Sequence, residues 1–252
     1  MPSVVALGDS VTVGVGDVGS PAGWAAHVAY ALEAGDFTNV ARLGARARDV
    51  TLEQMPLATL KRPDLATLLV GGNDVLRGDF SAQQVGAHVE RTVDVMARQA
   101  SDLVVVLLHD PRPTLPGPRI VGEVLAERAA MVNEAVLSRI AGAPRLVTVD
   151  PAGSPFTSTR AAWSVDRLHP SAAGHRALAR MVLEALAPLG WSGVRPIAEP
   201  TEPQPNGWQR AWWLARYGTP WFAKRSRDLL PELALVCWQH RRRRRVASCA
   251  ST

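Results

Sequence analysis

Residues 4–10 read VVALGDS, a short apolar run that ends in a glycine, an aspartate and a serine. An apolar run of this length predicts a buried strand. A serine at the carboxyl end of such a strand points into the crevice where open α/β sheets bind their ligands. Gly8 permits a sharp backbone turn, and Asp9 tolerates an irregular one. Ser10 is therefore a candidate nucleophile, although an ordinary strand-to-helix turn has the same sequence.

Apolar runs alternate with helical patterns along the first three quarters of the chain. We expect strands at residues 4–7, 38–43, 65–70, 103–108 and 145–149. We expect helices at residues 24–33, 47–55, 82–99, 123–140 and 171–187, with Ser20-Pro21 capping the first of them. This alternation predicts an α/β fold with a parallel sheet covered by helices on both faces. Among the few allowed topologies we choose the flavodoxin-like three-layer α/β/α sandwich, with strand order 2-1-3-4-5.

Four polar blocks follow the predicted strands. Ser10 follows the first strand, Gly44 the second and Gly71-Gly72-Asn73-Asp74 the third. The block Asp166-Arg167-Leu168-His169-Pro170 lies between the fifth strand and the last helix. Because the carboxyl ends of parallel strands meet at one edge of a sheet, we expect the four blocks to form one site.

These groups suit acyl transfer. The Ser10 hydroxyl needs a base, His169 is a suitable one, and Asp166 can fix the tautomer of that histidine. The backbone N–H groups of Ser10 and Gly44 and the side-chain amide of Asn73 are candidate oxyanion donors. We expect Asp9 to support its own turn through backbone hydrogen bonds.

In these blocks the sequence resembles the SGNH (GDSL-type) hydrolases, a family of esterases and lipases. The resemblance covers residues 3–190 and maps the family motifs onto Ser10, Gly44, Asn73 and His169, with Asp166 as the acid. It implies the SGNH hydrolase fold and the cleavage of esters, thioesters or O-acetyl groups through an acyl-enzyme, without a cofactor or metal. Leu43 departs from the pattern, because many relatives carry a serine there.

Other features fit ordinary structural roles. Residues 14–19 match G-x-G-x-x-G, but we expect the helix to begin after Pro21, and Asp17 would repel a bound phosphate, so we predict no nucleotide cofactor. Asp9 and Asp74 lack further ligands at metal-binding spacing, so we predict no metal. We expect His175 to face solvent and His109 to lie at the edge of the site, where it is a candidate pocket residue. The alternative function is a non-catalytic ligand-binding module on the same fold.

Composition suggests one main domain. The 252 residues are 47% hydrophobic and 20% charged, as in soluble globular proteins. We expect a catalytic domain at residues 1–193, a proline-rich linker at 194–207 and a tryptophan-rich helical extension with an arginine tail at 208–252. Cys237 and Cys249 are too few for a disulfide framework, and the N-terminus lacks a secretory signal, so we expect a cytoplasmic protein.

The positive charge is local. The five arginines at 241–245 equal the net charge of +5. We therefore expect a small-molecule ester substrate and no nucleic-acid partner. For the arginine run alone we expect weak attraction to an anionic membrane surface.

Overall fold

The computed structural model describes residues 1–99, 102–115 and 118–200, together with residues 234, 235 and 238. Its centre is a parallel sheet of five strands in the order β2-β1-β3-β4-β5. The strands are β1 (Ser3–Gly8), β2 (Asp36–Asn39), β3 (Leu65–Leu69), β4 (Asp102–Val106) and β5 (Leu146–Val149). The predicted fold class and strand order are confirmed.

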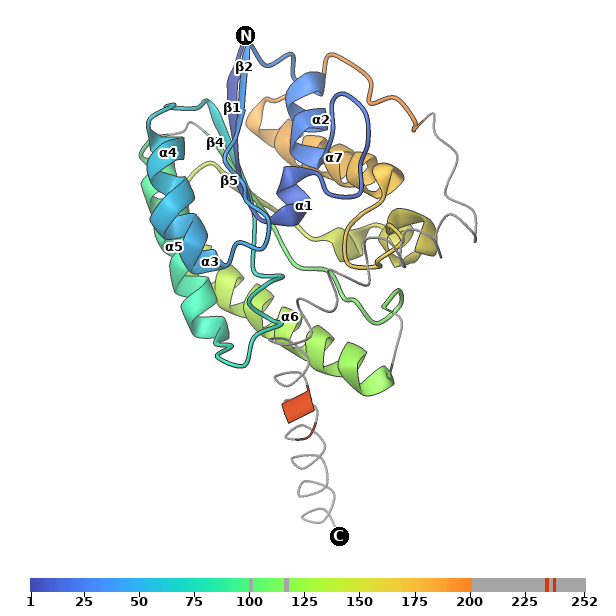
Figure 1. The fold of residues 1–252 in the computed structure, drawn as a ribbon. Helices are drawn as coiled ribbons and strands as arrows, with labels where there is room; N and C mark the ends of the chain where they lie inside the picture. Colours follow the sequence, from blue (N-terminus) through green and yellow to red (C-terminus); the bar gives the residue numbers. More distant parts are fainter. Residues whose placement is uncertain (100–101, 116–117, 201–233, 236–237, 239–252) are drawn as a thin grey trace.

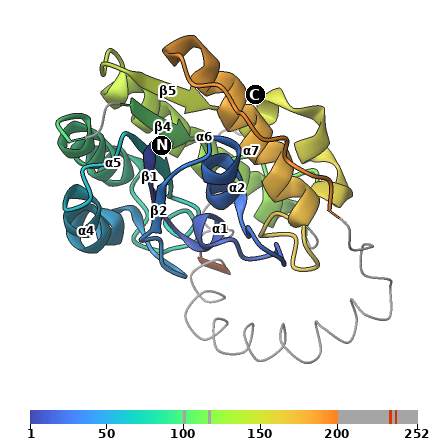
Figure 2. The ribbon, with the colours of Figure 1, turned by 90° about the horizontal axis from the view of Figure 1, so that it is seen from above.

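Helices cover both faces of the sheet (Figures 1 and 2). On one face lie α3 (Ala47–Asp49), a π-helical turn (Val50–Gln54), α4 (Met55–Thr59), α5 (Ala82–Ala97) and α6 (Arg119–Ile140). On the other lie α1 (Ser10–Val13), α2 (Trp24–Ala31) and α7 (Ala172–Leu186).

Strand β1 belongs to both hydrophobic cores because successive side chains of a strand point to opposite faces. Val5 and Leu7 pack with α5 and α6, whereas Val4 and Ala6 pack with α2 and α7. All four side chains are buried. Residues 4–7 therefore form an interior strand, and its carboxyl end lies between the two layers of helices.

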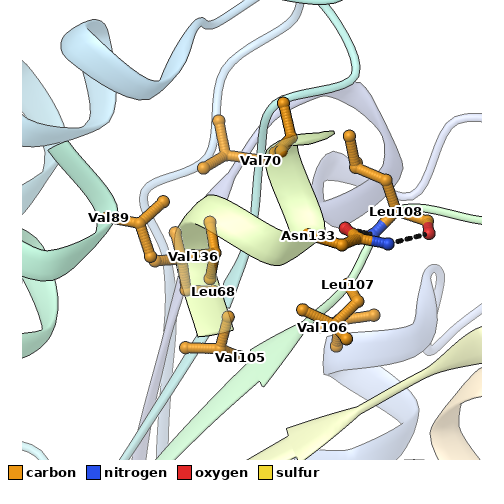
Figure 3. Close-up of a pocket in the computed structure, with 10 residues that line it drawn as sticks. Leu68, Val70, Val89, Val105, Val106, Leu107, Leu108, Asn133 and Val136 are labelled. Carbon is orange, nitrogen blue, oxygen red and sulfur yellow. Dashed lines mark hydrogen bonds between the residues drawn. The ribbon is translucent and has the colours of Figure 1, made fainter. Parts of the chain in front are cut away.

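Two strands end earlier than predicted, and a side-chain amide bonds the main chain beside each of these ends. Strand β2 ends at Asn39, where Oδ1 accepts from the Ala41 N–H and Nδ2 donates to the Thr12 carbonyl. Strand β4 ends at Val106, and beyond it Asn133 on α6 brackets Leu108 with two bonds, of 2.9 and 2.8 Å (Figure 3). Beyond the end of β2 the Val40 and Arg42 N–H groups still donate to the Ala6 and Gly8 carbonyls of β1.

The helix starts also required correction. Ser20-Pro21 is a cis peptide and does not cap the first long helix, so that prediction was wrong. Helix α2 begins at Trp24, after the N-cap Gly23, whose N–H is taken by the Asp17 carboxylate at 2.9 Å. The short helix α1 was not foreseen, and the predicted helix 47–55 extends to Thr59 through the π-helical turn.

The described part of the predicted linker, residues 194–200, lies against α2 and α7. The N–H groups of Val194 and Arg195 donate to the Ala31 carbonyl, and Arg180 on α7 donates to the Ile197 carbonyl. The expectations for the extension, including Cys237, Cys249 and the arginine tail, lie outside the described residues. Within the described part of the chain, no helix is long and apolar enough to cross a bilayer.

Candidate active site

Ser10 begins α1 directly after the sharp turn at the end of β1. Gly8 has φ 148, and a Cβ there would lie 2.2 Å from the Leu69 carbonyl oxygen, so only glycine fits this position. Asp9 is the N-cap of α1, and its Oδ1 accepts from the Val11 N–H at 3.0 Å. Asp9 therefore anchors its own turn, as the sequence predicts.

Gln54 holds the same turn from the π-helical segment. Its Oε1 accepts from the Gly8 N–H and its Nε2 donates to the Gly8 carbonyl, both at 2.8 Å. The Gln54 side chain is completely buried. The π-helical turn aims this amide at the end of β1, where the Gly8 carbonyl also accepts from the Arg42 N–H at 3.2 Å, and such turns are frequent at functional sites. No sequence signal identified Gln54, because it lies 46 residues from its partner.

The structure brings Ser10, His169 and Asp166 into one hydrogen-bonded chain. His169 Nε2 lies 2.8 Å from Ser10 Oγ, and His169 Nδ1 lies 2.7 Å from Asp166 Oδ2. An ionised Asp166 can only accept, so the Nδ1 position carries the proton and Nε2 is free to accept from the Ser10 hydroxyl. This is the arrangement in which a serine is activated by a neighbouring base.

Asp166 also organises the loop that carries His169. Its Oδ1 accepts from the Leu168 N–H and the His169 N–H, each at 3.0 Å, and from the Ser164 hydroxyl at 2.9 Å. An antiparallel bridge between Trp163 and Pro170 closes the loop. Ser164 was missed by sequence reasoning, because nothing in its neighbourhood marks it as a partner of the acid.

Two carboxylates in the site, the half-buried Asp166 and the buried Asp9, have opposite pKa shifts. For Asp166 burial acts to raise the pKa, but the hydrogen bond and charge of His169 and the backbone N–H donors outweigh it and lower the pKa to about 2. Burial raises the pKa of Asp9 to about 6, despite the Val11 N–H bond. Asp166 is thus a permanent anion at neutral pH, whereas Asp9 is held at an electrostatic cost.

The loops that carry Gly44 and Asn73 are joined to each other. Asn73 Nδ2 donates to the Ala45 carbonyl at 3.0 Å, one residue beyond Gly44. Asp74 accepts from the Ala47 N–H at 3.0 Å and from Arg46 Nε at 3.1 Å. Gly44 itself has φ 76, in the left-handed region that favours glycine. The second and third polar blocks therefore form one unit at the carboxyl edge of the sheet.

The glycine-rich segment at 14–19 contains Asp17, whose carboxylate bonds neighbouring helices. The Asp17 carboxylate accepts from His27 Nε2 at 2.8 Å and from Arg176 Nη1 at 2.9 Å. Burial raises the pKa of Asp17, but these hydrogen bonds and the Gly23 N–H lower it to about 2. A carboxylate fixed in this loop would repel a phosphate, which agrees with the prediction that the segment is no nucleotide fingerprint.

Two further aromatic side chains, those of Trp24 and His109, pack against neighbouring parts of the structure. Trp24 is completely buried in the core between the sheet, α2 and α7. The His109 ring packs on the Trp163 ring with centroids 3.9 Å apart, beside the loop of His169. Burial lowers the pKa of His109 to about 4, so this ring is neutral at pH 7.

The prediction that His175 faces solvent was wrong. The side chain is completely buried beneath the segment that follows α1. Its Nδ1 accepts from the Trp24 N–H at 3.2 Å, and its Nε2 bonds the Val15 carbonyl at 3.0 Å. The helical pattern of α7 misled here, because a histidine on the buried side of a helix is expected only when two polar partners await it.

The structure is similar to those of several esterases and lipases. The lipase Lip_vut3 from a goat rumen metagenome superposes with a TM-score of 0.60 at 18% identity, over 77% of this chain and 100% of the lipase. TesA gives a TM-score of 0.58 at 20% identity, over 74% and 99% of the two chains. Axe2, an acetylxylan esterase from Geobacillus stearothermophilus, gives 0.55 at 20% identity, over 78% and 97%. At these identities the likeness establishes the fold.

Sequence comparison establishes the family. No curated protein sequence matches the chain. The profile of the GDSL-like lipase/acylhydrolase family, however, matches residues 6–177, from the middle of β1 into α7. This range contains Ser10, the Gly44 and Asn73 loops, Asp166 and His169. The chain therefore belongs to the GDSL-like lipase/acylhydrolase family.

Proposed function

We propose that the protein is a serine esterase that cleaves carboxylic esters through an acyl-enzyme. The observation that carries the proposal is the 2.8 Å contact between Ser10 Oγ and His169 Nε2, continued by the 2.7 Å contact between His169 Nδ1 and Asp166. Membership of an acylhydrolase family supports the same reaction class.

In the first half-reaction Ser10 Oγ attacks the ester carbonyl carbon while His169 Nε2 takes the hydroxyl proton. The tetrahedral oxyanion is held by the N–H groups of Ser10 and Gly44 and by the Asn73 amide. Collapse breaks the bond to the alcohol oxygen, which receives the proton from His169. Asp166 stays ionised and stabilises the imidazolium that forms between these steps.

In the second half-reaction a water molecule attacks the acyl-enzyme while His169 takes its proton. The second tetrahedral intermediate collapses to the free acid, and the proton returns to Ser10 Oγ. No metal or cofactor takes part in this scheme. The rival function, nucleotide or flavin binding in the crevice, is disfavoured by the Asp17 carboxylate, which lies within the G-x-G-x-x-G segment and bonds the Gly23 N–H and Arg176.

For the substrate we propose a carboxylic ester, with O-acetylated sugars and thioesters as the related classes to compare. Axe2 is an acetylxylan esterase and Lip_vut3 is a lipase, so the same fold accommodates both an acetyl ester and a lipid ester. A panel of nitrophenyl esters from acetyl to palmitoyl, acetylated xylo-oligosaccharides and acyl-thioesters distinguishes these classes.

The decisive experiment is Ser10→Ala together with a fluorophosphonate probe. We expect wild-type protein to be labelled once, at Ser10, and to hydrolyse at least one ester of the panel, whereas Ser10→Ala does neither. Ser81→Ala is the matched control, because the Ser81 hydroxyl caps α5 by accepting from the Gln84 N–H and has no place in the proposed reaction. Ester turnover by Ser10→Ala at the wild-type rate would refute the proposed nucleophile, and a chromophore that copurifies with an inactive wild-type protein would favour the binding module.

A further inference from the structure

His175 connects α7 to the segment that follows α1. It lies in the first turn of α7, a helix that starts three residues after His169, at Ala172. Its Nδ1 accepts from the Trp24 N–H and its Nε2 lies 3.0 Å from the Val15 carbonyl oxygen. These two partners fix the tautomer, because a backbone N–H needs an acceptor and a carbonyl needs a donor. Burial lowers the pKa of His175 to about 4, so the ring is neutral at pH 7.

Val15 in turn contacts the nucleophile. The Val15 N–H donates to the Ser10 carbonyl at 3.1 Å, closing the end of α1. Two consecutive hydrogen bonds therefore lead from the His175 ring to the main chain of Ser10. Since His175 and His169 are part of one helix and its entry loop, these bonds join the backbone of the nucleophile to the element that carries the base.

Gly16 shows how closely the two elements approach. It has φ 100, and a Cβ at this position would lie 2.0 Å from the carbonyl oxygen of Pro170, the residue directly after His169. The next residue, Asp17, is tied to α2 through His27 and to α7 through Arg176. The segment 14–17 thus lies against α1, α2 and α7, and the buried His175 contacts it at Val15.

We propose that His175 is a positioning residue, which holds residues 14–16 between α1 and α7 and so sets the separation between Ser10 Oγ and His169 Nε2. The inference rests on the proposed function. Helix α1 has only four residues, so it is too short to be stable by itself and takes its position from its surroundings. A displacement of about 1 Å between reacting groups can cost about 10²-fold in rate, so such a contact affects chemistry and not only folding.

Two substitutions separate the contacts of the ring. In His175→Gln the amide nitrogen reaches the place of Nε2 and can still donate to the Val15 carbonyl. In His175→Asn the shorter amide oxygen takes the place of Nδ1 and can accept from the Trp24 N–H, while Val15 loses its donor. Each variant keeps one buried hydrogen bond and loses the other, so their losses of stability should be similar.

The readout is the second-order rate of Ser10 labelling by a fluorophosphonate, together with kcat and KM for the best nitrophenyl ester. We expect His175→Asn to label at least about fivefold more slowly than His175→Gln, with the loss in kcat and an unchanged KM. Trp191→Phe is the stability control, because it removes the bond from Trp191 Nε1 to Asp102, at the other end of the sheet. We expect it to melt earlier and to label at the wild-type rate.

A difference of less than about fivefold between the two His175 variants would overturn the positioning role, since a purely structural histidine predicts equal losses. Should neither variant fold, hydrogen exchange of the Val15 amide in the wild-type protein decides. Strong protection supports the proposal that the Val15 N–H is held on the Ser10 carbonyl, and exchange at the rate of an unstructured peptide overturns it. Failure of the proposed function is seen separately, because it requires turnover by Ser10→Ala.

Discussion

The two halves of the site are built in different ways. Ser10 follows an interior strand whose neighbours β2 and β3 fix it through main-chain hydrogen bonds. His169 and Asp166 lie in the long connection between β5 and α7, which contains only the one-turn 3-10 helices Pro151–Gly153, Pro155–Ser158 and Arg160–Ala162 (Figure 1). The proposed nucleophile, Ser10, is held by the regular sheet, whereas the proposed base, His169, is held by side-chain hydrogen bonds in an irregular loop.

The difference shows that one carboxylate serves two purposes in the irregular half. Asp166 orients the His169 ring through Oδ2 and folds the loop through Oδ1. In the regular half these tasks are divided, because Asp9 and Gln54 hold the turn and the Ser10 hydroxyl remains for chemistry. Substitution of Asp166, which serves both purposes, should therefore do more damage than substitution of either residue that holds the turn before Ser10.

Among the residues that act through Ser10 or His169, the largest effect is expected for Asp166→Asn. The amide can retain the loop contacts of Oδ1 but donates toward His169, so the ring is held in the wrong tautomer. We expect kcat to fall by about 10⁴, as in other serine hydrolases with this change. Steady-state hydrolysis of a nitrophenyl ester measures the loss, with circular dichroism as the check on folding. A fall of less than about tenfold would remove Asp166 from the proposed triad.

The second effect tests the oxyanion donors, which belong to the nucleophile half. Asn73→Ala removes the side-chain amide that follows β3, and we expect kcat to fall by about 10²–10³. KM should change little, because the oxyanion exists only in the transition state. Asp79→Ala, which loses only an exposed contact to Arg46, is the control. Full turnover by Asn73→Ala would show that this amide does not touch the oxyanion.

The same contrast explains what the sequence predicts. Ser10 could be placed because an apolar run predicts a buried strand and the topology places its end at the crevice. His169 and Asp166 were found by residue type and spacing, since no periodicity describes their loop. Gln54 and His175 were missed, because their roles depend on partners 46 and 160 residues away, and a helical pattern does not reveal a polar side chain that meets a main chain in the core.

The Ser20-Pro21 prediction failed for a related reason. A serine before a proline is a common helix start, but the Asp17 carboxylate reaches Gly23 and α2 begins there instead. Local propensity therefore predicts which elements exist, while tertiary contacts determine where they begin and end.

Acid should change the free energy of unfolding in opposite directions through Asp9, beside Ser10, and through His175, on α7. Burial raises the pKa of Asp9 to about 6 from 3.8, so the folded state binds more protons than the unfolded state in that range, and acidification stabilises it. Burial lowers the pKa of His175 to about 4 from 6.5, so the unfolded state binds more protons there, and acidification destabilises the fold. Each change amounts to about 3 kcal/mol of unfolding free energy.

Urea unfolding between pH 7 and pH 4 measures this contrast. We expect the stability of Asp9→Asn to fall more steeply with acid than that of the wild type, and that of His175→Gln to fall less steeply. The groups that act on the His175 ring, Asp17, His27 and His169, remain in both variants. Comparison with the wild type cancels their contribution and that of His109. Parallel curves for all three proteins would contradict the assigned shifts.

A smaller effect on labelling is expected for Gln54, whose side-chain amide bonds the main chain at the end of β1. Gln54→Ala leaves the Gly8 N–H buried without its partner, which should cost about 2 kcal/mol of stability. Asn133→Ala is the matched control, because it breaks the equivalent pair of bonds at Leu108. Denaturant melts should show similar losses for both. Fluorophosphonate labelling should slow only for Gln54→Ala, and equal labelling rates would show that the turn at Gly8 holds Ser10 without Gln54.

The smallest effect should come from Ser164→Ala in the histidine half. It removes the 2.9 Å bond to Asp166 Oδ1, while the N–H groups of Leu168 and His169 remain to hold that oxygen. We expect a loss of about 1 kcal/mol in transition-state stabilisation, about fivefold in kcat, with little change in melting temperature. Leu168→Pro removes a second donor to Asp166 Oδ1, the Leu168 N–H. If the donors to this oxygen are redundant, Ser164→Ala lowers kcat little alone but much more in combination with Leu168→Pro. Simple additivity of the two losses would mean that the contacts of Asp166 act independently, and that the histidine half is no more cooperative than the strand that carries Ser10.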